Sequence, residues 1–162
     1  MSSSQRLQDR AIIVVGSATG IGAATVRRLA DEGARLCLAD INSEGAESLA
    51  EEVRRGGGDA FAVPIDLADE ASVTAAFTEA VKGLGGIRGV HINAADMSVL
   101  NDDSDALAED LAVFDRTLQV NLRGHLLCTR AVLPHLLSAG EGVIVYTSSG
   151  AADVGEKTRP AY

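Results

Sequence analysis

Three glycines, at positions 16, 20 and 22, lie between an apolar run and a segment with helical periodicity. Glycine adopts positive φ and lets the backbone approach a phosphate, and a helix that follows directs free N–H groups and a positive dipole end at that anion. The spacing therefore predicts a turn that binds the pyrophosphate of a dinucleotide, although a purely structural turn stays the alternative. The predicted cofactor-binding residues of this turn are Gly16, Ser17, Thr19, Gly20, Ile21 and Gly22.

Asp40 ends the next apolar run, 18 residues after Gly22. A carboxylate at about this distance accepts hydrogen bonds from the adenosine ribose hydroxyls and repels a 2′-phosphate. Thr19 is neutral, and neither Ile41 nor Asn42 beside the carboxylate is basic. The sequence therefore favours NAD over NADP, with Asp40 and Ile41 as cofactor-binding residues. The alternative interpretation of Asp40 is a cap for the helix that follows.

Apolar runs and helical segments alternate along the chain. Strands are predicted over residues 10–16, 34–40, 59–65, 87–94 and 142–148, and helices over 20–33, 43–55, 66–84, 107–119 and 122–138, with Asp69 as a cap. Strands that are apolar throughout and alternate with helices are typical of an α/β, doubly wound parallel sheet (Rossmann-like), here in one domain over residues 1–162. Such sheets bind ligands at the carboxyl ends of their strands, directly after the predicted strands.

Composition argues against several other functions. The net charge is −9 and aromatic residues make up 3% of the chain, so a basic stripe or a stacking surface for nucleic acid is not expected. No run of apolar residues is long enough for a membrane span, and residues 1–6 lack the apolar core of a signal peptide. We therefore expect no nucleic-acid or membrane partner and a cytoplasmic location.

The cysteines and the acidic loop give no metal site. Cys37 and Cys128 lie in apolar runs, which predicts two buried thiols and no disulfide framework. The loop at residues 101–105 carries three aspartates, and the alternatives are a metal site or a solvated surface. Because the spacing is not that of an EF-hand, we expect a solvated surface and no metal.

In this order, the motifs resemble the short-chain dehydrogenase/reductase family from about residue 8 onward. The glycine turn is similar to that family's TGxxxGxG motif, with Val15 in place of the usual Thr. Asp66-Leu67 resembles the pair that meets the adenine ring. Asn93-Ala94-Ala95 is similar to the NNAG motif, although Ile92 replaces its first Asn and Ala95 its Gly. The resemblance implies that these residues bind the cofactor.

The same resemblance implies the chemistry, which is the interconversion of a secondary alcohol and a ketone by hydride transfer to or from NAD. Ser149, in Thr147-Ser148-Ser149, would polarise the carbonyl, and Tyr162, 13 residues later, would be the general acid/base. Asn121 would help to hold a water chain. From the residues alone, the alternatives are that Ser149 ends a strand, that Asn121 caps a helix, and that Tyr162 is an ordinary residue.

The family's lysine, four positions after the tyrosine, would fall beyond residue 162. A free tyrosine has a pKa of about 10, so the acid/base role needs that positive charge. Lys157 precedes Tyr162 in a loop and does not have the family spacing. Two explanations stay open: the sequence is part of a longer enzyme, or it is a fragment that binds dinucleotide without catalysis or serves as an assembly subunit.

The predicted helix over 122–138 carries many leucines, and the resemblance implies that it pairs with a further helix in an oligomer interface, in a dimer or a tetramer. Without a partner we expect its apolar face to meet water, which favours a homo-oligomer. The substrate is expected to be a small alcohol or ketone of unassigned identity. The residues expected to border its pocket are Met97, Ser98, Val99 and Val154.

Overall fold

The computed structural model describes residues 5–154 and 157–162. Residues 1–4, which belong to the N-terminal segment discussed above, lie outside the described residues. Strands and helices alternate along the chain as predicted, and the five strands form a single sheet. The strands are β1 (Ala11–Val15), β2 (Arg35–Asp40), β3 (Asp59–Pro64), β4 (Gly89–Ile92) and β5 (Val143–Tyr146). The helices are α1 (Gly20–Asp31), α2 (Ser43–Arg55), α3 (Glu70–Leu84), α4 (Leu111–Leu118), a π-helical segment (Gln119–Gly124), α5 (His125–Ala139) and a 3₁₀ turn (Gly150–Asp153).

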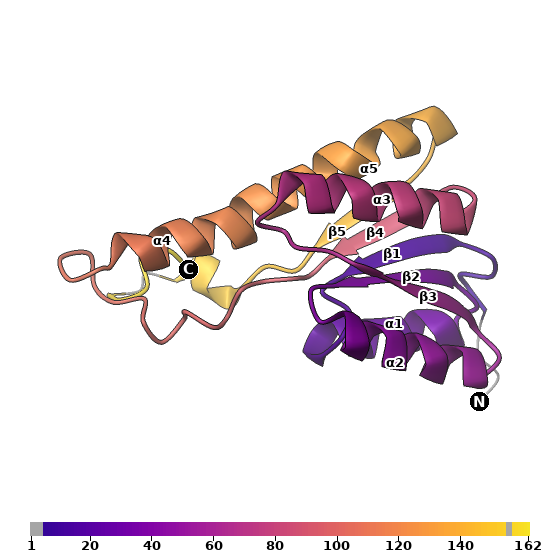
Figure 1. Ribbon diagram of the computed structural model, residues 1–162, viewed down its shortest axis with the longest axis horizontal. Coiled ribbons are helices and arrows are strands. Elements are labelled where there is room, and N and C mark those ends of the chain that lie inside the picture. The colour runs from indigo at the N-terminus through magenta and orange to yellow at the C-terminus, as the bar shows by residue number, and fades with distance from the viewer. Residues whose placement is uncertain (1–4, 155–156) are drawn as a thin grey trace.

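All strand pairs are parallel, in the order β3-β2-β1-β4-β5. Helices α1 and α2 cover one face of this sheet, and α3 and α5 cover the other (Figure 1). The chain leaves β1 toward β2 on one side and returns to β4 on the other, so the strand order reverses between β1 and β4. In a doubly wound sheet, this reversal opens a crevice at the carboxyl ends of the strands. The predicted fold class is confirmed.

Each layer has its own apolar core. Val14, Leu36 and Leu38 are buried beneath α1 and α2, while Ile13, Val63 and Ile92 are buried beneath α3 and α5. Alternate residues of β1 thus serve opposite faces, as the period-two geometry of a strand requires. Both predicted buried cysteines are confirmed, and burial raises the pKa of each thiol to about 12.

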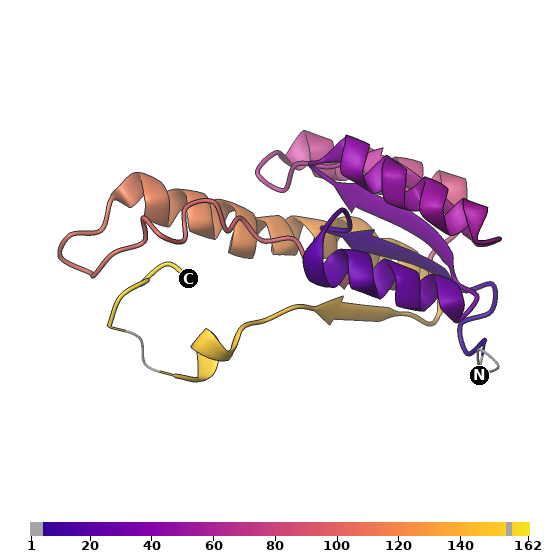
Figure 2. The same cartoon turned by 90° about the horizontal axis from the view of Figure 1, so that it is seen from below.

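The predicted helices over 107–119 and 122–138 form one continuous element. Residues 107–110 precede it, because the Asp110 carboxylate accepts a hydrogen bond from the Ala112 N–H and caps the first turn. The π-helical segment then joins α4 directly to α5. This long element carries α4 beyond the body as an arm, and residues 157–162 lie beside the arm (Figures 1 and 2).

The leucine-rich helix exposes part of its apolar surface, as expected, and buries the rest against the body of the molecule. Leu127, Val132 and Leu136 are buried against α3 and the sheet. The opposite side of the helix carries the exposed leucines, which are Leu122, Leu126, Leu133 and Leu137. No helix among residues 5–154 and 157–162 is both long enough and apolar enough to cross a membrane.

Candidate functional site

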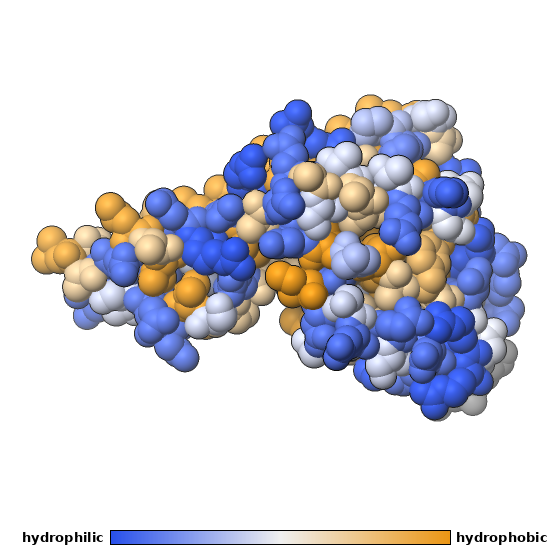
Figure 3. Space-filling model, in the orientation of Figure 1, coloured by the Kyte–Doolittle hydropathy of each residue, from blue (hydrophilic) through white to orange (hydrophobic). Residues whose placement is uncertain are grey.

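A cavity of about 920 Å³ lies at the carboxyl ends of the strands. This volume falls within the ~300–1,000 Å³ that is typical of ligand pockets. Seen as a surface, the molecule is hollowed where the arm meets the body, and apolar side chains gather there (Figure 3). The cavity collects most of the residues predicted from sequence, namely Gly16, Thr19, Gly20, Ile21, Asp40, Ile41, Asp66, Leu67, Asn93, Ala94, Ala95, Ser149 and Tyr162.

The glycine turn forms the floor of this cavity between β1 and α1, and its backbone requires two of its glycines. Gly16 has φ +81°, and a Cβ there would lie 2.5 Å from the Cα of Ala94. A Cβ at Gly22 would overlap the carbonyl oxygen of Gly16. Gly20 also has positive φ, +55°, but faces open space. The turn therefore leaves a concave backbone surface directly before the N-terminus of α1, the geometry that accepts a phosphate.

Ser17, by contrast, is fully buried, and its hydroxyl donates to the carbonyl oxygen of Ala39 at 3.3 Å. Its side chain therefore braces the turn against β2 rather than lining the cavity. Only the backbone of Ser17 remains for a cofactor contact.

Asp40 ties the turn to the end of β2. Its Oδ2 accepts a hydrogen bond from the Ala18 N–H at 2.8 Å, and its Oδ1 accepts one from the Asn42 N–H at 2.9 Å. The cap of α2 is Asn42, whose side chain accepts from the Gly45 N–H, so the interpretation of Asp40 as that cap is wrong. A carboxylate has about four lone-pair sites, which leaves two for the hydroxyls of a ribose.

These observations fit a dinucleotide across the crevice. In such a complex the concave turn would hold the two phosphates, and Asp40 stands where the adenosine ribose would lie. Ile41 and Leu67 line the same end of the cavity, and the Asp66 carboxylate is fixed there by the Ala68 N–H at 2.9 Å. The other end of the cavity holds Ser149 and Tyr162.

Ser149 follows β5 and caps the 3₁₀ turn, where its hydroxyl accepts from the Ala151 N–H at 3.2 Å. Tyr162 comes back toward Ser149 from the end of the chain, and its backbone N–H donates to Oδ2 of Asp103 at 3.1 Å. The two residues also share a smaller hollow of about 340 Å³ with Val154. The structure therefore brings the predicted serine and tyrosine to one place.

Asn121 lies inside the π-helical segment, so the alternative that it caps a helix is wrong. Its Oδ1 accepts a hydrogen bond from the backbone N–H of Asp96 at 2.7 Å. Its Nδ2 is buried and has no hydrogen-bond partner among the described residues. A buried amide N–H without a partner is a position where a bound water or ligand atom would be stabilised.

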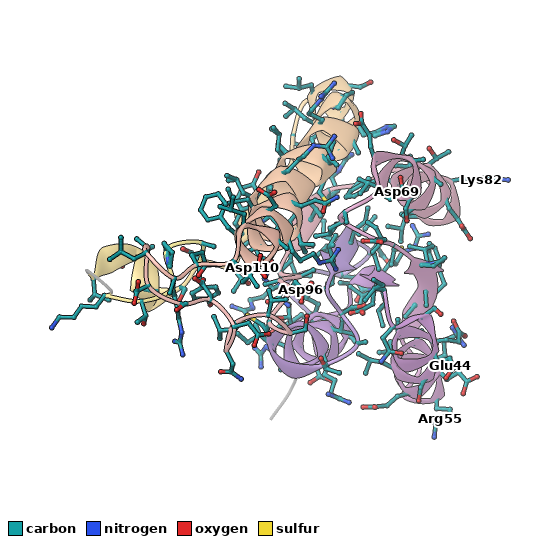
Figure 4. All side chains as sticks on the ribbon, turned by 60° about the vertical axis from the view of Figure 1, so that its left-hand side comes forward. Glu44, Arg55, Asp69, Lys82, Asp96 and Asp110 are labelled. Carbon is teal, nitrogen blue, oxygen red and sulfur yellow. The ribbon has the colours of Figure 1, made fainter. Side chains whose placement is uncertain are left out.

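Sequence reasoning missed Asp96 and Arg116. Asp96 accepts from the N–H and the hydroxyl of Ser98, and its Oδ2 lies 2.7 Å from Nε of Arg116. The hydroxyl of Ser98 and the guanidinium of Arg116 lower the pKa of the Asp96 carboxyl. In Figure 4, Asp96 lies between the helical arm and α1. The sequence did contain a signal for Asp96, because it directly follows a predicted strand and the motif at residues 93–95, where ligand-binding residues are expected.

In the acidic loop Asp102 and Asp105 are exposed, as expected. Asp103 is the exception: it is 6% exposed, and its carboxylate accepts a hydrogen bond from the backbone N–H of Tyr162. Among residues 5–154 and 157–162, no group of three His, Cys, Asp or Glu side chains is placed to hold a metal ion.

Of the residues expected to border the substrate pocket, Met97 and Ser98 line the main cavity and Val154 lines the smaller hollow, but Val99 lines neither. Lys82 points outward into solvent from α3, on the side of the molecule away from the arm (right in Figure 4).

The comparisons agree with this geometry. A model of the family described as short chain dehydrogenase matches residues 10–162. The chain belongs to the short-chain dehydrogenase family. Relatives include the D-threitol dehydrogenase of Mycolicibacterium smegmatis, 39% identical over 97% of this chain, and the cis-4-hydroxycyclohexanecarboxylate dehydrogenase of Sinomonas cyclohexanicum, 34% identical over 95%.

Solved structures of short-chain dehydrogenases superpose closely. Levodione reductase matches with a TM-score of 0.89 and 32% identity, over 97% of this chain and 60% of that one. A 7α-hydroxysteroid dehydrogenase in complex with NADH and 7-oxo glycochenodeoxycholic acid matches with a TM-score of 0.90 and 26% identity, over 100% of this chain and 62% of that one. This chain spans 59% of the threitol enzyme and 60% of the cyclohexanecarboxylate enzyme, so it covers less than two thirds of these relatives.

Proposed function

We propose that the protein is an NAD-dependent oxidoreductase that interconverts a secondary alcohol and a ketone. One observation carries the proposal: a single cavity is lined at one end by the glycine turn and Asp40, and at the other by Ser149 and Tyr162. A dinucleotide with its phosphates on the turn and its ribose at Asp40 would extend toward the two hydroxyl side chains. The family membership and the names of its relatives support the same class of reaction.

NAD is the proposed cofactor, and NADP is disfavoured. Asp40 presents a carboxylate where a 2′-phosphate would lie, and like charges in contact disfavour binding. Ile41 lines the cavity beside it and is uncharged. The NADH in the related hydroxysteroid dehydrogenase supports a nicotinamide cofactor for this fold.

In the proposed mechanism, the cofactor supplies the ring carbon that accepts or releases hydride. The Ser149 hydroxyl donates a hydrogen bond to the substrate oxygen and stabilises the negative charge that develops there. The Tyr162 hydroxyl gives a proton to that oxygen during reduction and removes it during oxidation. Asn121 would help to hold a water chain for proton exchange through its buried Nδ2–H, which has no partner among the described residues.

The substrate is proposed to be a small secondary alcohol or ketone. Met97 gives the cavity an apolar contact, and Ser98 and Arg116 give it polar ones. The relatives act, by name, on threitol and on a hydroxylated cyclohexane acid, which are compact secondary alcohols. A homo-oligomer and a cytoplasmic location complete the proposal and rest on the sequence.

The test measures NAD(H) binding and NAD reduction by the full-length natural protein over a panel of cyclic and polyol secondary alcohols. We expect NAD to bind more tightly than NADP, and at least one alcohol to be oxidised. Ser149→Ala and Tyr162→Phe should each lower kcat about 100-fold or more while NAD affinity stays within about 3-fold. A matched control is Ser138→Ala, at an exposed hydroxyl on α5 outside the cavity.

The possible results separate the two candidate functions. Binding of NAD without turnover of any alcohol would favour the dinucleotide-binding subunit over the enzyme. Absence of NAD(H) binding would contradict both. Binding of NADP as tightly as NAD would contradict only the proposed role of Asp40.

A further inference from the structure

A chain of hydrogen bonds crosses from the sheet to the glycine turn and includes a histidine that the proposed mechanism does not use. Nε2 of His91, in β4, lies 2.8 Å from the hydroxyl oxygen of Thr147. That hydroxyl lies 2.9 Å from Oδ1 of Asn93. Nδ2 of Asn93 lies 3.0 Å from the carbonyl oxygen of Gly16. The chain thus begins on a central strand and ends on the first glycine of the turn.

The last acceptor fixes the direction of every bond in this chain. The Gly16 carbonyl only accepts, so the Asn93 amide must direct its N–H₂ at the turn and its oxygen at Thr147. The Asn93 oxygen also only accepts, and the Thr147 hydroxyl therefore donates its single proton to Asn93. Thr147 can then only accept from His91, whose Nε2 must carry a proton. His91 is the terminal donor.

The other ring nitrogen of His91 agrees with this assignment. Nδ1 is buried and has no hydrogen-bond partner among the described residues. A proton there would be buried without an acceptor, whereas a bare lone pair is less costly. Burial also lowers the pKa of His91, and no charged group contributes to that shift. The charged residues along the neighbouring groove are Arg10, Arg88 and Glu141. The ring is therefore neutral, with its proton on Nε2.

The chain joins the two ends of the proposed active site. Gly16 carries the close contact with Gly22 that shapes the phosphate-binding turn. Thr147 lies two residues before Ser149 and is anchored by its own N–H to the Ile92 carbonyl at 3.1 Å. A change in the Asn93 amide would therefore alter both the turn and the end of β5.

We propose that His91 is a positioning residue that acts through Thr147 and Asn93 to hold the Gly16 carbonyl and the end of β5 in the geometry that binds NAD(H). This inference rests on the proposed function, because it assumes that the turn binds the cofactor. His91 does not line the cavity that holds the glycine turn, Ser149 and Tyr162. Its contribution is to remove the rotational freedom of the Asn93 amide.

The experiment compares NAD(H) dissociation constants of the full-length natural protein and four variants. His91→Leu removes the terminal donor, and Thr147→Val removes the hydroxyl with little change of shape. We expect each to weaken binding about 3- to 10-fold, the range of one lost hydrogen bond. His91→Gln keeps an N–H near the position of Nε2 and should stay within about 2-fold. Val145→Ala, beside His91 on β5, is the control and should leave affinity unchanged.

Two further readouts separate positioning from general stability. The double variant His91→Leu with Thr147→Val should bind no more weakly than the weaker single variant, because both break one chain. Histidine ¹⁵N shifts of the unliganded protein should show the proton of His91 on Nε2. If wild type binds NAD(H) and both single variants bind equally well, the positioning role is overturned. A proton on Nδ1 would overturn it too, and failure of wild type to bind would overturn the proposed function itself.

Discussion

At the scale of single residues, the turn after β1 requires glycine because there is no room for a Cβ at Gly16 or Gly22. Gly22 makes this plain, because any Cβ would overlap the Gly16 carbonyl oxygen. That carbonyl also accepts from the Asn93 side chain, so it cannot move away freely. The sequence predicted a glycine turn at these positions, and the structure adds the close approach of Gly22 to the Gly16 carbonyl, which leaves no room for a Cβ.

We therefore expect Gly22→Ala to weaken NAD(H) binding at least 10-fold and to lower the free energy of unfolding by about 1–3 kcal/mol, the usual range for overpacking. Calorimetry of NAD(H) binding and urea denaturation measure the two effects. Gly89→Ala in β4 is the control, because a Cβ there would have its nearest neighbour at 3.6 Å. Equal affinities for Gly22→Ala and wild type would contradict the geometry of the turn.

The neutral ring of His91 predicts a pH dependence of stability. Burial lowers the pKa of His91 in the folded state, whereas an unfolded histidine titrates near 6.5. The unfolded chain therefore binds the proton more readily, and stability falls as the pH drops from about 6.5 through the folded pKa. In His91→Gln, the difference in the free energy of unfolding between pH 7.5 and pH 5.5 should be smaller. An unchanged difference would show that His91 does not titrate as the structure requires.

At the scale of elements, the sequence predicted the order of strands and helices because burial and capping are local properties. Asp69 caps α3 as predicted, through the Ala71 N–H. The junction at residues 119–124 was missed, because a π-helical segment keeps helical backbone angles and leaves no break in the apolar pattern. The start of α4 was also misplaced, since the cap at Asp110 lies within the predicted helix.

The candidate site was predictable where a motif names a residue, and not where the contact depends on strand register. Thr147 follows β5 and bonds to Asn93 because Ile92 pairs with Tyr146. No spacing in the sequence encodes that register. Asp96 and Arg116 are 20 residues apart, and they meet only because α4 projects beside the loop after β4.

The pair of Asp96 and Arg116 should fasten this loop to the arm. We expect Arg116→Gln to lower the free energy of unfolding by about 1 kcal/mol, since Arg116 is partly exposed and solvent screens the pair. Amides at residues 96–100 should then exchange hydrogen faster. The Asp96 carboxylate, whose pKa is lowered, stabilises the fold above about pH 4 and ceases to do so as the pH falls through its folded pKa.

Arg123→Gln is the matched control on the same helical element, because its ion pair with Glu70 is half exposed on both sides. It should leave the exchange of residues 96–100 unchanged. If the two variants exchange alike, Arg116 does not hold the loop.

At the scale of the whole molecule, one side of the sheet and of α5 is uncovered. β5 is an edge strand, and Val143, Val145 and Tyr146 on it are about half exposed. The exposed leucine stripe, Leu122, Leu126, Leu133 and Leu137, runs along α5 and the segment before it. Figure 3 shows apolar side chains along the upper border of the molecule, over α5. Exposed large apolar side chains gathered on one helix are typical of an interaction surface.

We therefore predict that the full-length protein self-associates through the leucine stripe. Replacing both Leu126 and Leu137 by Glu should reduce the assembly in sedimentation velocity, because four charges would face each other across a symmetric contact. The fold should survive, since these side chains are 57% and 71% exposed. His135→Glu adds charge at an exposed position off the stripe and should not change the assembly. A monomeric wild type, or an assembly that both glutamates leave intact, would show that the stripe serves another contact.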